Sequence, residues 1–375
     1  MTNGVDKNKK ITIYDIAQEL HISIATVSRA LNGKEDISEK TREAVYEAAE
    51  RMGYKASKTA ASLSRKEKKF AALFPDLIHD YDNEVRRGIQ KAVEELHDYH
   101  VSVEMITIEG KAEGYMEKLK ELSYKDYDGA LIIPPEGEEQ LSELLRSTRL
   151  GKLSLVTMTT DLDRDVRVFG VQSNGLVAGH MAGELLATLL GSGKKVALIT
   201  GQMTSQIHKS TAKGFLAEVE AQKLNFAGIY EHYDDPEKAY ETAGRLIVEH
   251  PDLDGIYLAT ANSVTFCGRL VELGYGGKIK IIASDVFPKM VELVRSGLVY
   301  ATIFQNPFNQ GRLAVHYLFE YLVGERKFGK NEILLDPQIV IRSNIELYEK
   351  KWGLNNVRSL TCRLDGVSES VFLAT

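Results

Sequence analysis

The stretch Ile11–Tyr54 reads ITIYDIAQELHISIATVSRALNGKEDISEKTREAVYEAAERMGY, and the spacing of its apolar residues indicates three short helices. Thr12 lies just before the first apolar run and Asp15 follows three residues later, as in a capping box. Ser23 can cap a second helix, which Asn32-Gly33 would end. Two short helices joined by a tight turn, with a third closing the core, form the helix-turn-helix plan.

The third helix is expected to open at Ser38 and to end at Gly53. Apolar residues at helical spacing in the three helices would form one small core: Ile13, Ile16, Ala17, Leu20, Val27, Ala30, Leu31, Val45, Ala48, Ala49 and Met52. Any small three-helix bundle would show the same periodicity. The periodicity alone therefore predicts the fold of this segment and leaves its function open.

The outward face of the second helix favours a DNA-reading role over a plain bundle. Its residues are small or form hydrogen bonds: Ile24, Ala25, Thr26, Ser28 and Arg29. A helix that faces only solvent would normally carry Glu and Lys at such positions. Arg29 can donate two hydrogen bonds to one guanine.

The motifs T-I-Y-D-I-A, S-x-x-T-V-S-R-A-L-N-G, S-x-K-T-R and G-Y occur in this order without gaps, and they resemble the DNA-binding headpiece of the LacI/GalR family of bacterial repressors. The resemblance implies that Ile24, Ala25 and Arg29 approach base edges in the major groove. It also implies phosphate contacts from Thr12, Tyr14, Ser23, Thr26, Ser28, Asn32, Ser38, Thr41 and Tyr54. Phosphate contacts would position the domain, and base contacts would choose the sequence.

The charge is divided unevenly along the chain. The net charge of the 375 residues is −6, but residues 1–70 hold 14 basic and 10 acidic side chains, a net of +4. The remainder therefore carries a net of −10. DNA would repel this acidic part, which suits a domain that senses something else.

Composition predicts a soluble globular protein, with 43% apolar and 27% charged residues. The length suggests more than one domain, or one domain with lobes. No apolar run reaches the roughly 18 residues of a membrane span, and residues 1–10 lack the apolar core of a secretory signal. We expect a cytoplasmic protein that does not contact a membrane. Cys267 and Cys362 fit no metal motif, and they are expected to be ordinary thiols; neither a metal nor a cofactor is expected.

Residues 1–10 are expected to be a disordered arm, residues 11–56 the headpiece and residues 57–68 a hinge or linker. In the family the matching segment folds into a short helix on DNA, which implies DNA contacts from Ala60 and from Leu63, the residue that would wedge into the minor groove. This sequence has Ala-Ser where the family usually has Pro-Asn, so the turn before the hinge is less preorganised. A plain flexible linker is the alternative.

From Phe70 onward short apolar runs alternate with amphipathic stretches. The expected strands are Phe70–Phe74, Val101–Ile108, Gly129–Ile133, Leu153–Met158, Val196–Thr200, Gly255–Thr260, Ile279–Ala283 and Ala301–Phe304. The expected helices include Asp82–Tyr99, Asn174–Leu190, Gln206–Ala221, Pro236–Glu249, Ser263–Leu273, Pro288–Arg295 and Phe308–Val323. This alternation predicts doubly wound parallel sheets in two lobes, over residues 69–350, with ligands beyond the carboxyl ends of the strands.

Polar residues follow several of these strands and are candidate effector ligands: His79, Tyr81, Asp82, Asp161, His208, Asn262, Asp285 and Gln305. Carboxylates, amides and an aromatic ring suit the hydroxyls and the apolar face of a sugar. The run from Gly191 to Lys194 resembles part of a P-loop. It follows a helix and precedes a strand, the reverse of the required order, so it is interpreted as a helix stop.

The passage Ile281–Gly311 contains S-D-x-x-x-x-M-V-E-L-V-R-S-G-L-V-Y-A-T-I-F-Q-x-P-x-x-x-G, which resembles the periplasmic binding protein type I-like fold of ribose-binding type that LacI-family effector domains share. The resemblance implies that Asp285, Gln305 and Asn262 bind sugar hydroxyls, and that Tyr81 stacks on the sugar ring.

The sequence departs from this pattern at several positions. His79 replaces an asparagine, and Ser173 replaces the aspartate of a common pair with Asn174. Thr211 stands where an arginine often clamps a sugar oxygen, and His208 could supply the missing donor. These departures leave the identity of the sugar open.

We therefore expect a transcription regulator, a repressor, that binds a palindromic double-stranded operator as a homodimer and responds to a small carbohydrate between two lobes. The alternatives are a regulator of a non-sugar ligand (a nucleobase, sugar alcohol or sugar phosphate) and a solute-binding protein. A glycosidase or metalloenzyme would need carboxylate or histidine spacings that are not evident, so no enzyme is expected. The tail at residues 351–375 lacks leucine heptads, and we assign it no role.

Overall fold

The computed structural model divides the described part of the chain into two compact units, the first ending with a helix at Arg51 and the second beginning with a strand at Lys68. The structure describes residues 13–31, 37–52, 67–76, 80–109, 111–135, 137–324, 327–328 and 332–349. The expected arm at residues 1–10, nearly all of the hinge at residues 57–68 and the tail at residues 351–375 lie outside this description.

The first unit contains the three expected helices, α1 (Ile13–Glu19), α2 (Ile24–Leu31) and α3 (Glu39–Arg51). Their buried core consists of Ile16, Ala17, Val27, Ala30, Val45, Ala48 and Ala49. Each of these residues was predicted to be in the core from helical spacing. Because the apolar spacing within each helix is local and regular, the sequence alone predicted these core residues correctly.

Two identical caps begin the second and third helices. The hydroxyl of Ser23 accepts a hydrogen bond from the backbone N of Thr26 at 3.0 Å, and that of Ser38 accepts one from Thr41 at 3.2 Å. These bonds satisfy amides that a helix start would otherwise leave unpaired. The predicted helix starts at Ser23 and Ser38 are confirmed, whereas the predicted cap at Thr12 lies outside the described residues.

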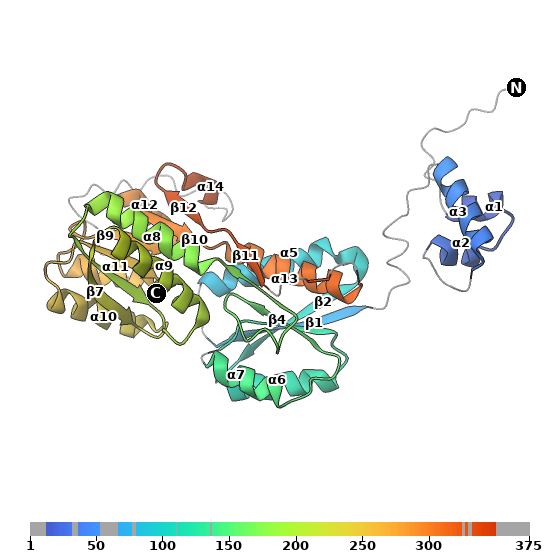
Figure 1. The fold of residues 1–375 in the computed structure, drawn as a ribbon, viewed down its shortest axis with the longest axis horizontal. Helices are drawn as coiled ribbons and strands as arrows, with labels where there is room; N and C mark the ends of the chain where they lie inside the picture. Colours follow the sequence, from blue (N-terminus) through green and yellow to red (C-terminus); the bar gives the residue numbers. More distant parts are fainter. Residues whose placement is uncertain are drawn as a thin grey trace, which may run out of the picture. The chain divides into compact units, whose positions relative to one another are not determined.

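The first lobe of the second unit is built on a parallel sheet with the strand order β11-β5-β4-β3-β1-β2. Its strands are β1 (Lys68–Pro75), β2 (Val101–Ile108), β3 (Gly129–Ile132), β4 (Ser154–Met158), β5 (Phe169–Ser173) and β11 (Glu332–Leu335). Figure 1 shows α5 (Asp80–Glu95) and α13 (Pro307–Leu322) on one face, and α6 (Ala112–Tyr124) and α7 (Glu138–Arg146) on the other. A short 3-10 helix, η1 (His97–Tyr99), precedes β2.

The second lobe has a sheet with the order β12-β10-β9-β8-β6-β7, parallel except for β12. Its strands are β6 (Lys195–Thr200), β7 (Asn225–Glu231), β8 (Gly255–Ala259), β9 (Lys280–Ser284), β10 (Ala301–Phe304) and β12 (Gln338–Ile341). Its helices are α8 (Gly175–Leu190), α9 (Gln206–Ala221), α10 (Pro236–Glu249), α11 (Ser263–Glu272), α12 (Pro288–Ser296) and α14 (Glu346–Glu349).

Alternate residues of one strand enter different cores, which is why this strand reads as a continuous apolar run. Val196 and Leu198 of β6 pack with α8 and α9, whereas Ala197 and Ile199 pack with α10, α11 and α12. A strand covered on both faces loses the polar alternation of a half-exposed strand. The predicted two-lobed α/β fold with parallel sheets is confirmed.

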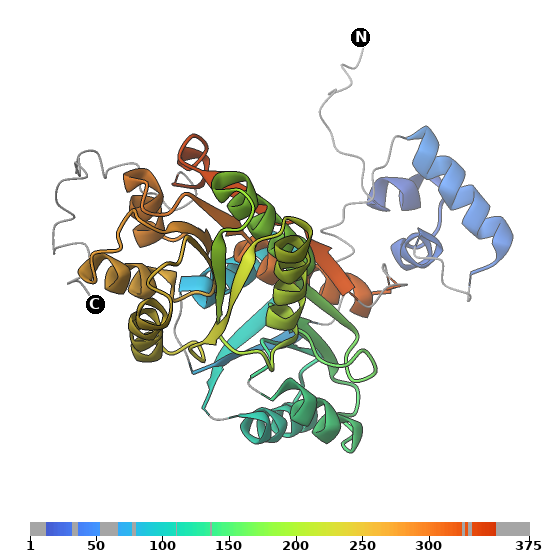
Figure 2. The ribbon, with the colours of Figure 1, turned by 60° about the vertical axis from the view of Figure 1, so that its left-hand side comes forward.

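The chain passes between the lobes three times: from β5 to α8, from β10 to α13, and from β11 to β12 (Figure 1 and Figure 2). These crossings place the carboxyl ends of both sheets at the same cleft. Within the described ranges, no helix is long and apolar enough to span a membrane.

Close helix contacts hold the cleft-lining elements in place. A Cβ on Gly88 of α5 would lie 1.9 Å from the carbonyl oxygen of Phe308 on α13. In the other lobe, a Cβ on Gly179 of α8 would lie 2.0 Å from the carbonyl oxygen of Thr211 on α9. Only glycine permits such approaches of backbone to backbone. Both α5 and α9 carry residues that face the cleft.

Candidate functional site

A pocket of about 190 Å³ lies between the two lobes of the second unit. It is lined by residues that directly follow β1, β3 and β4 in one lobe and β6 to β10 in the other. This is the edge of the sheets at which ligands bind in such folds.

The structure brings five of the predicted ligands to this pocket: Tyr81, Asp82, His208, Asp285 and Gln305. Two come from the start of α5, one from the first turn of α9, and two from the ends of β9 and β10. His79 lies outside the described residues. The predicted departure at Thr211 also lines the pocket, where it replaces a cationic side chain with a neutral hydroxyl.

Asp285 and Gln305 form a fixed pair. The backbone N of Gln305 donates to Oδ1 of Asp285 at 2.8 Å, and its Nε2 donates to Oδ2 at 2.9 Å. Asp285 is 2% exposed and has a φ of 62°, a left-handed conformation that only a few residue types adopt. Burial raises the pKa of its carboxyl to about 7, although the two hydrogen bonds oppose the rise.

Gln310, which the sequence did not single out, connects this pair to the other lobe. Its Nε2 donates to the hydroxyl of Tyr81 at 2.8 Å and to the carbonyl oxygen of Gln305 at 2.9 Å. Tyr81 is thereby held against the pocket, and burial raises the pKa of its phenol well above the usual value. The only signal for Gln310 was its place one residue before Gly311 in the recognised motif.

Asp82 is 7% exposed, yet no group in the described part of the chain forms a hydrogen bond or ion pair with its carboxylate. Burial raises the pKa of this carboxyl to about 7. The Arg86 guanidinium opposes the rise, and the carboxylate of Asp234 in the other lobe adds to it. Arg86 itself lies over the ring of Phe74 at 3.7 Å.

Glu138, at the start of α7, was missed by the sequence analysis and reaches across the cleft. Its carboxylate accepts hydrogen bonds from the hydroxyl of Ser205 at 3.0 Å and from the backbone N of Gln206 at 2.8 Å. In its own lobe it accepts one from Thr160 at 2.5 Å. His208, in the first turn of α9, has its Nδ1 against the backbone of Gln202.

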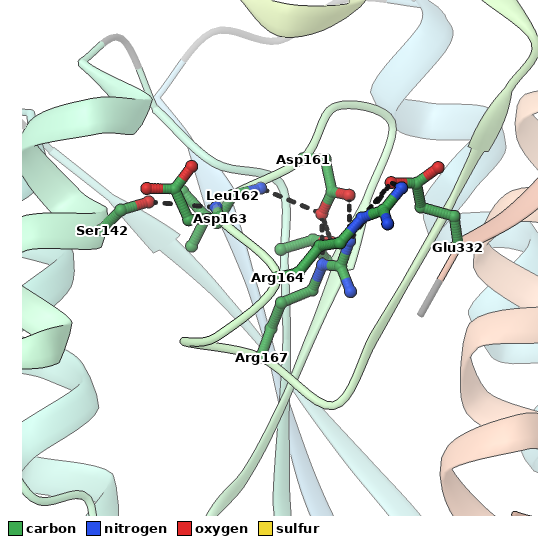
Figure 3. A network of polar contacts seen from close by, with 8 residues as sticks. Ser142, Asp161, Leu162, Asp163, Arg164, Arg167 and Glu332 are labelled. Carbon is green, nitrogen blue, oxygen red and sulfur yellow. Dashed lines mark hydrogen bonds and ion pairs between the residues drawn. The ribbon is translucent and has the colours of Figure 1, made fainter. Parts of the chain in front are cut away.

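The structure does not bring Asp161 to the pocket, so that assignment is corrected. Figure 3 shows its carboxylate turned toward the guanidinium of Arg167, whose Nε donates at 2.6 Å and whose side chain is fully buried. The hydroxyl of Thr157 and the backbone N of Leu162 also donate to Asp161. With both oxygens in this network, Asp161 supports the loop after β4 and does not offer a ligand contact.

Asn262 lies beside the pocket without lining it. Thr260 and Ala261, which precede it, do line the pocket. Asn262 begins α11, and its buried Nδ2 has no hydrogen-bond partner in the described part of the chain. Its amide nitrogen is therefore buried next to the residues that line the site.

Two residues of the predicted outward face of α2 are exposed: Ile24, which is 38% exposed, and Arg29. Val27 and Ala30 of the same helix are fully buried. Ala25 and Ser28 lie on the same helix, Tyr14 lies on α1, and the hydroxyls of Ser23 and Ser38 also contact those of Thr26 and Thr41. The other predicted DNA contacts lie outside the described residues: Thr12, Asn32, Tyr54, Ala60 and Leu63.

Among the residues with a described placement, no three His, Cys, Asp or Glu side chains are grouped so as to hold a metal ion. Cys267 is a free thiol buried in the core of the second lobe, and Cys362 lies outside the described residues.

Comparison with known proteins agrees with both units. The family described as bacterial regulatory proteins, lacI family, matches residues 12–57, and the periplasmic binding protein domain matches residues 70–326. Catabolite control protein A of Staphylococcus aureus is 24% identical over 352 residues, which cover 90% of this chain and 98% of that protein. The HTH-type transcriptional regulator pepR1 of Lactobacillus delbrueckii subsp. lactis is 26% identical over 353 residues, 92% of this chain and 98% of that protein.

Among solved structures, the glucose-galactose binding protein GanP from Geobacillus stearothermophilus superposes with a TM-score of 0.67. It is 23% identical and covers 75% of this chain and 99% of its own. This similarity establishes the fold of the second unit. The chain belongs to the lacI family of bacterial regulatory proteins, DNA-binding transcription regulators in which a helix-turn-helix headpiece precedes a two-lobed periplasmic binding protein domain.

Proposed function

We propose that the chain binds a palindromic operator as a homodimer and represses transcription until a small carbohydrate occupies the pocket between the lobes. The observation that carries this proposal is the pocket itself, which joins the carboxyl ends of two sheets in a chain that also carries the DNA-binding unit. The action on operator DNA would take place in the cytoplasm.

A carbohydrate suits the pocket because its walls combine hydrogen-bonding groups with flat apolar surface. Asp285 and Gln305 offer oriented oxygens and an amide, and Tyr81 and Tyr257 offer rings. A sugar needs acceptors and donors for its hydroxyls and an apolar face for its ring. The similarity in fold to a glucose-galactose binding protein supports the same class of ligand.

Effector binding and operator binding would be coupled through the three chain segments that cross between the lobes. A ligand that binds both lobes favours the closed arrangement, and a change of closure would alter the spacing of the two headpieces in a dimer. A coupling of about 1–3 kcal/mol is typical of such regulators. Two-fold symmetry of the dimer would require a two-fold symmetric operator.

Binding without turnover is part of the proposal. Both oxygens of Asp285 are engaged by Gln305, which leaves that carboxyl poorly suited to act as a nucleophile or as a general acid. Incubation with chromogenic glycosides should release no chromophore.

The first test is thermal unfolding of the full chain with a panel of mono- and oligosaccharides, sugar alcohols, nucleobases and sugar phosphates. A ligand that binds only the folded state stabilises it and so raises the melting temperature. The stabilisation is about 2.7 kcal/mol when the ligand concentration is a hundred times its dissociation constant. A sugar that does so should also change the affinity for operator DNA selected from random sequence. Stabilisation by a nucleobase alone would overturn the carbohydrate proposal.

A further inference from the structure

We propose that the effector is an amino sugar, whose ammonium group lies between Asp82 of one lobe and Asp234 of the other. This inference rests on the proposed function and narrows the class of carbohydrate. It arises from the distribution of charge around the pocket, which is strongly one-sided.

Four carboxylates line the pocket, namely Asp82, Glu138, Asp234 and Asp285, whereas no lysine or arginine in the described part of the chain does so. Glu138 and Asp285 are satisfied by hydrogen bonds from the protein. Asp82 and Asp234 are not: none of the residues placed in the structure forms a hydrogen bond or ion pair with either carboxylate. Two acidic groups therefore face the pocket unpaired.

The cost of an unpaired carboxylate is greater at Asp82 than at Asp234, because Asp82 is only 7% exposed. A buried charge without a partner is costly and is normally paired, protonated or bound to a ligand. Arg86, the nearest cation on the same helix, does not form an ion pair with it; its guanidinium stacks on Phe74 and donates to the hydroxyl of Thr107 at 3.3 Å. The carboxylate of Asp82 is therefore left for the pocket.

Asp234 lines the same pocket from the other lobe. It has a φ of 55°, in the left-handed region, directly after the equally unusual Tyr233. Its carboxylate packs against the Cα of Gly201, where a Cβ would lie 2.3 Å from Oδ2 and 2.5 Å from the ring of His208. Asp234 therefore lies beside Gly201 and His208 at the pocket wall, in a backbone conformation that few residue types adopt.

Asp82 and Asp234 come from different lobes, and the charge of Asp234 disfavours the ionised form of Asp82 and adds to the rise in its pKa. An ammonium group between them would remove this repulsion and would supply each carboxylate with charge-assisted hydrogen bonds. A neutral sugar could supply hydroxyl donors only, and a sugar phosphate or sugar acid would be repelled. Thr211, in place of a clamping arginine, is consistent with this preference.

The test compares matched sugars on the full chain by titration calorimetry near neutral pH. Glucosamine and galactosamine are each compared with the parent sugar and the N-acetylated derivative, and a sugar phosphate is included. We expect at least one amine to bind about tenfold or more tighter than its neutral counterparts, and the sugar phosphate to bind weakest. Equal binding of amine, parent and N-acetylated sugar would overturn this inference and leave the proposed function standing.

Two variants locate the effect. Asp82→Asn and Asp234→Asn should each abolish the preference for the amine, measured as the ratio of its dissociation constant to that of the parent sugar in the same variant. Asp80→Asn, an exposed residue on the same helix, should keep the full preference. An amine preference that survives in both pocket variants would overturn the assignment, and a failure of every saccharide to bind would overturn the proposed function together with it.

Discussion

Glu138 in the first lobe accepts a hydrogen bond at 2.8 Å from the backbone N of Gln206 in the second. The carboxylate therefore lies at the N-terminus of α9, where the helix leaves its first amides unpaired and favours negative charge. Because α7 and α9 belong to different lobes, this contact joins the two lobes and should stabilise the arrangement in which they meet.

Glu138→Ala should therefore weaken effector binding about tenfold or more, since a hydrogen bond to a charged group contributes about 1.5–3 kcal/mol. The measurement is the dissociation constant of an effector found in the thermal panel. Glu139→Ala is the matched control. Among the described residues, that neighbouring side chain contacts only Lys209, in an exposed ion pair at 3.5 Å, and such pairs contribute little. Equal losses in the two variants would contradict a specific role for Glu138.

The raised pKa of Asp82 predicts a pH-dependent effect on stability. Well below pH 3.8, the usual pKa of this carboxyl, it is protonated in both the folded and the unfolded chain, so it costs nothing. As the pH rises to about 7, Asp82 ionises in the unfolded chain first. In the folded chain burial disfavours its ionised form; the charge of Asp234 adds to this effect and that of Arg86 opposes it. The free energy of unfolding therefore falls. Asp82→Asn removes this penalty.

The variant should accordingly be more stable than the wild type by up to about 4 kcal/mol near pH 7 and by much less near pH 4. Denaturant unfolding followed by circular dichroism at the two pH values measures the difference. Tyr115, whose phenol has a raised pKa and also faces Asp82, stays neutral throughout this range and does not interfere. A difference that is the same at both pH values would show that Asp82 is not protonated in the fold.

Local patterns explain why the sequence predicted much of this fold. The helices of the first unit and the strands at the centre of each sheet have strong periodicity or long apolar runs. The strands β5, β7, β11 and β12 were not predicted. β5 contains Gly170 and Gln172, β7 is a partly exposed edge strand, and β11 and β12 have four residues each. Their pairing depends on distant parts of the chain.

The residues of the site likewise include some that a local rule predicted and some that it did not. The rule that ligands follow parallel strands located Asp82 and Asp285, but it could not tell which way a loop side chain turns. Asp161 obeys the rule and turns inward because Arg167 provides a buried partner. Asp234 was missed because β7 before it was not recognised, and Glu138 because α7 was not. Whether two residues from different lobes meet is a property of the closed fold alone.

Close packing of α5 against α13 should make Gly88 sensitive to the smallest substitution. In Gly88→Ala the added Cβ would lie 1.9 Å from the carbonyl oxygen of Phe308, so α5 must move. Overpacking of this kind costs about 1–3 kcal/mol, and the shift would also displace Tyr81 and Asp82 from the pocket. Both the melting temperature and the effector affinity should fall.

Gly244→Ala is the control for this prediction. It lies within α10, and its Cβ would approach nothing nearer than Arg269, at 3.7 Å. Alanine is favoured over glycine in a helix by about 1 kcal/mol, so this variant should be as stable as the wild type or more stable. Unchanged effector affinity in Gly88→Ala would show that α5 is not positioned by this contact.

Arg29 tests the division of labour between the two units. It is exposed on α2, and if it reads a guanine, Arg29→Ala should cost about 1–3 kcal/mol of specific binding and relax discrimination at one base pair. Arg51→Ala removes the same charge from α3, where the side chain forms an ion pair with Glu19 at 3.1 Å. That control should weaken binding slightly and equally for all sequences, because it acts through general attraction to phosphates.

Competition binding with single-base operator variants separates the two effects, and the effector-induced thermal shift should be unchanged in both proteins. Loss of that shift in Arg29→Ala would mean that the DNA-binding unit contributes to the effector site, contrary to the pocket formed wholly by the second unit.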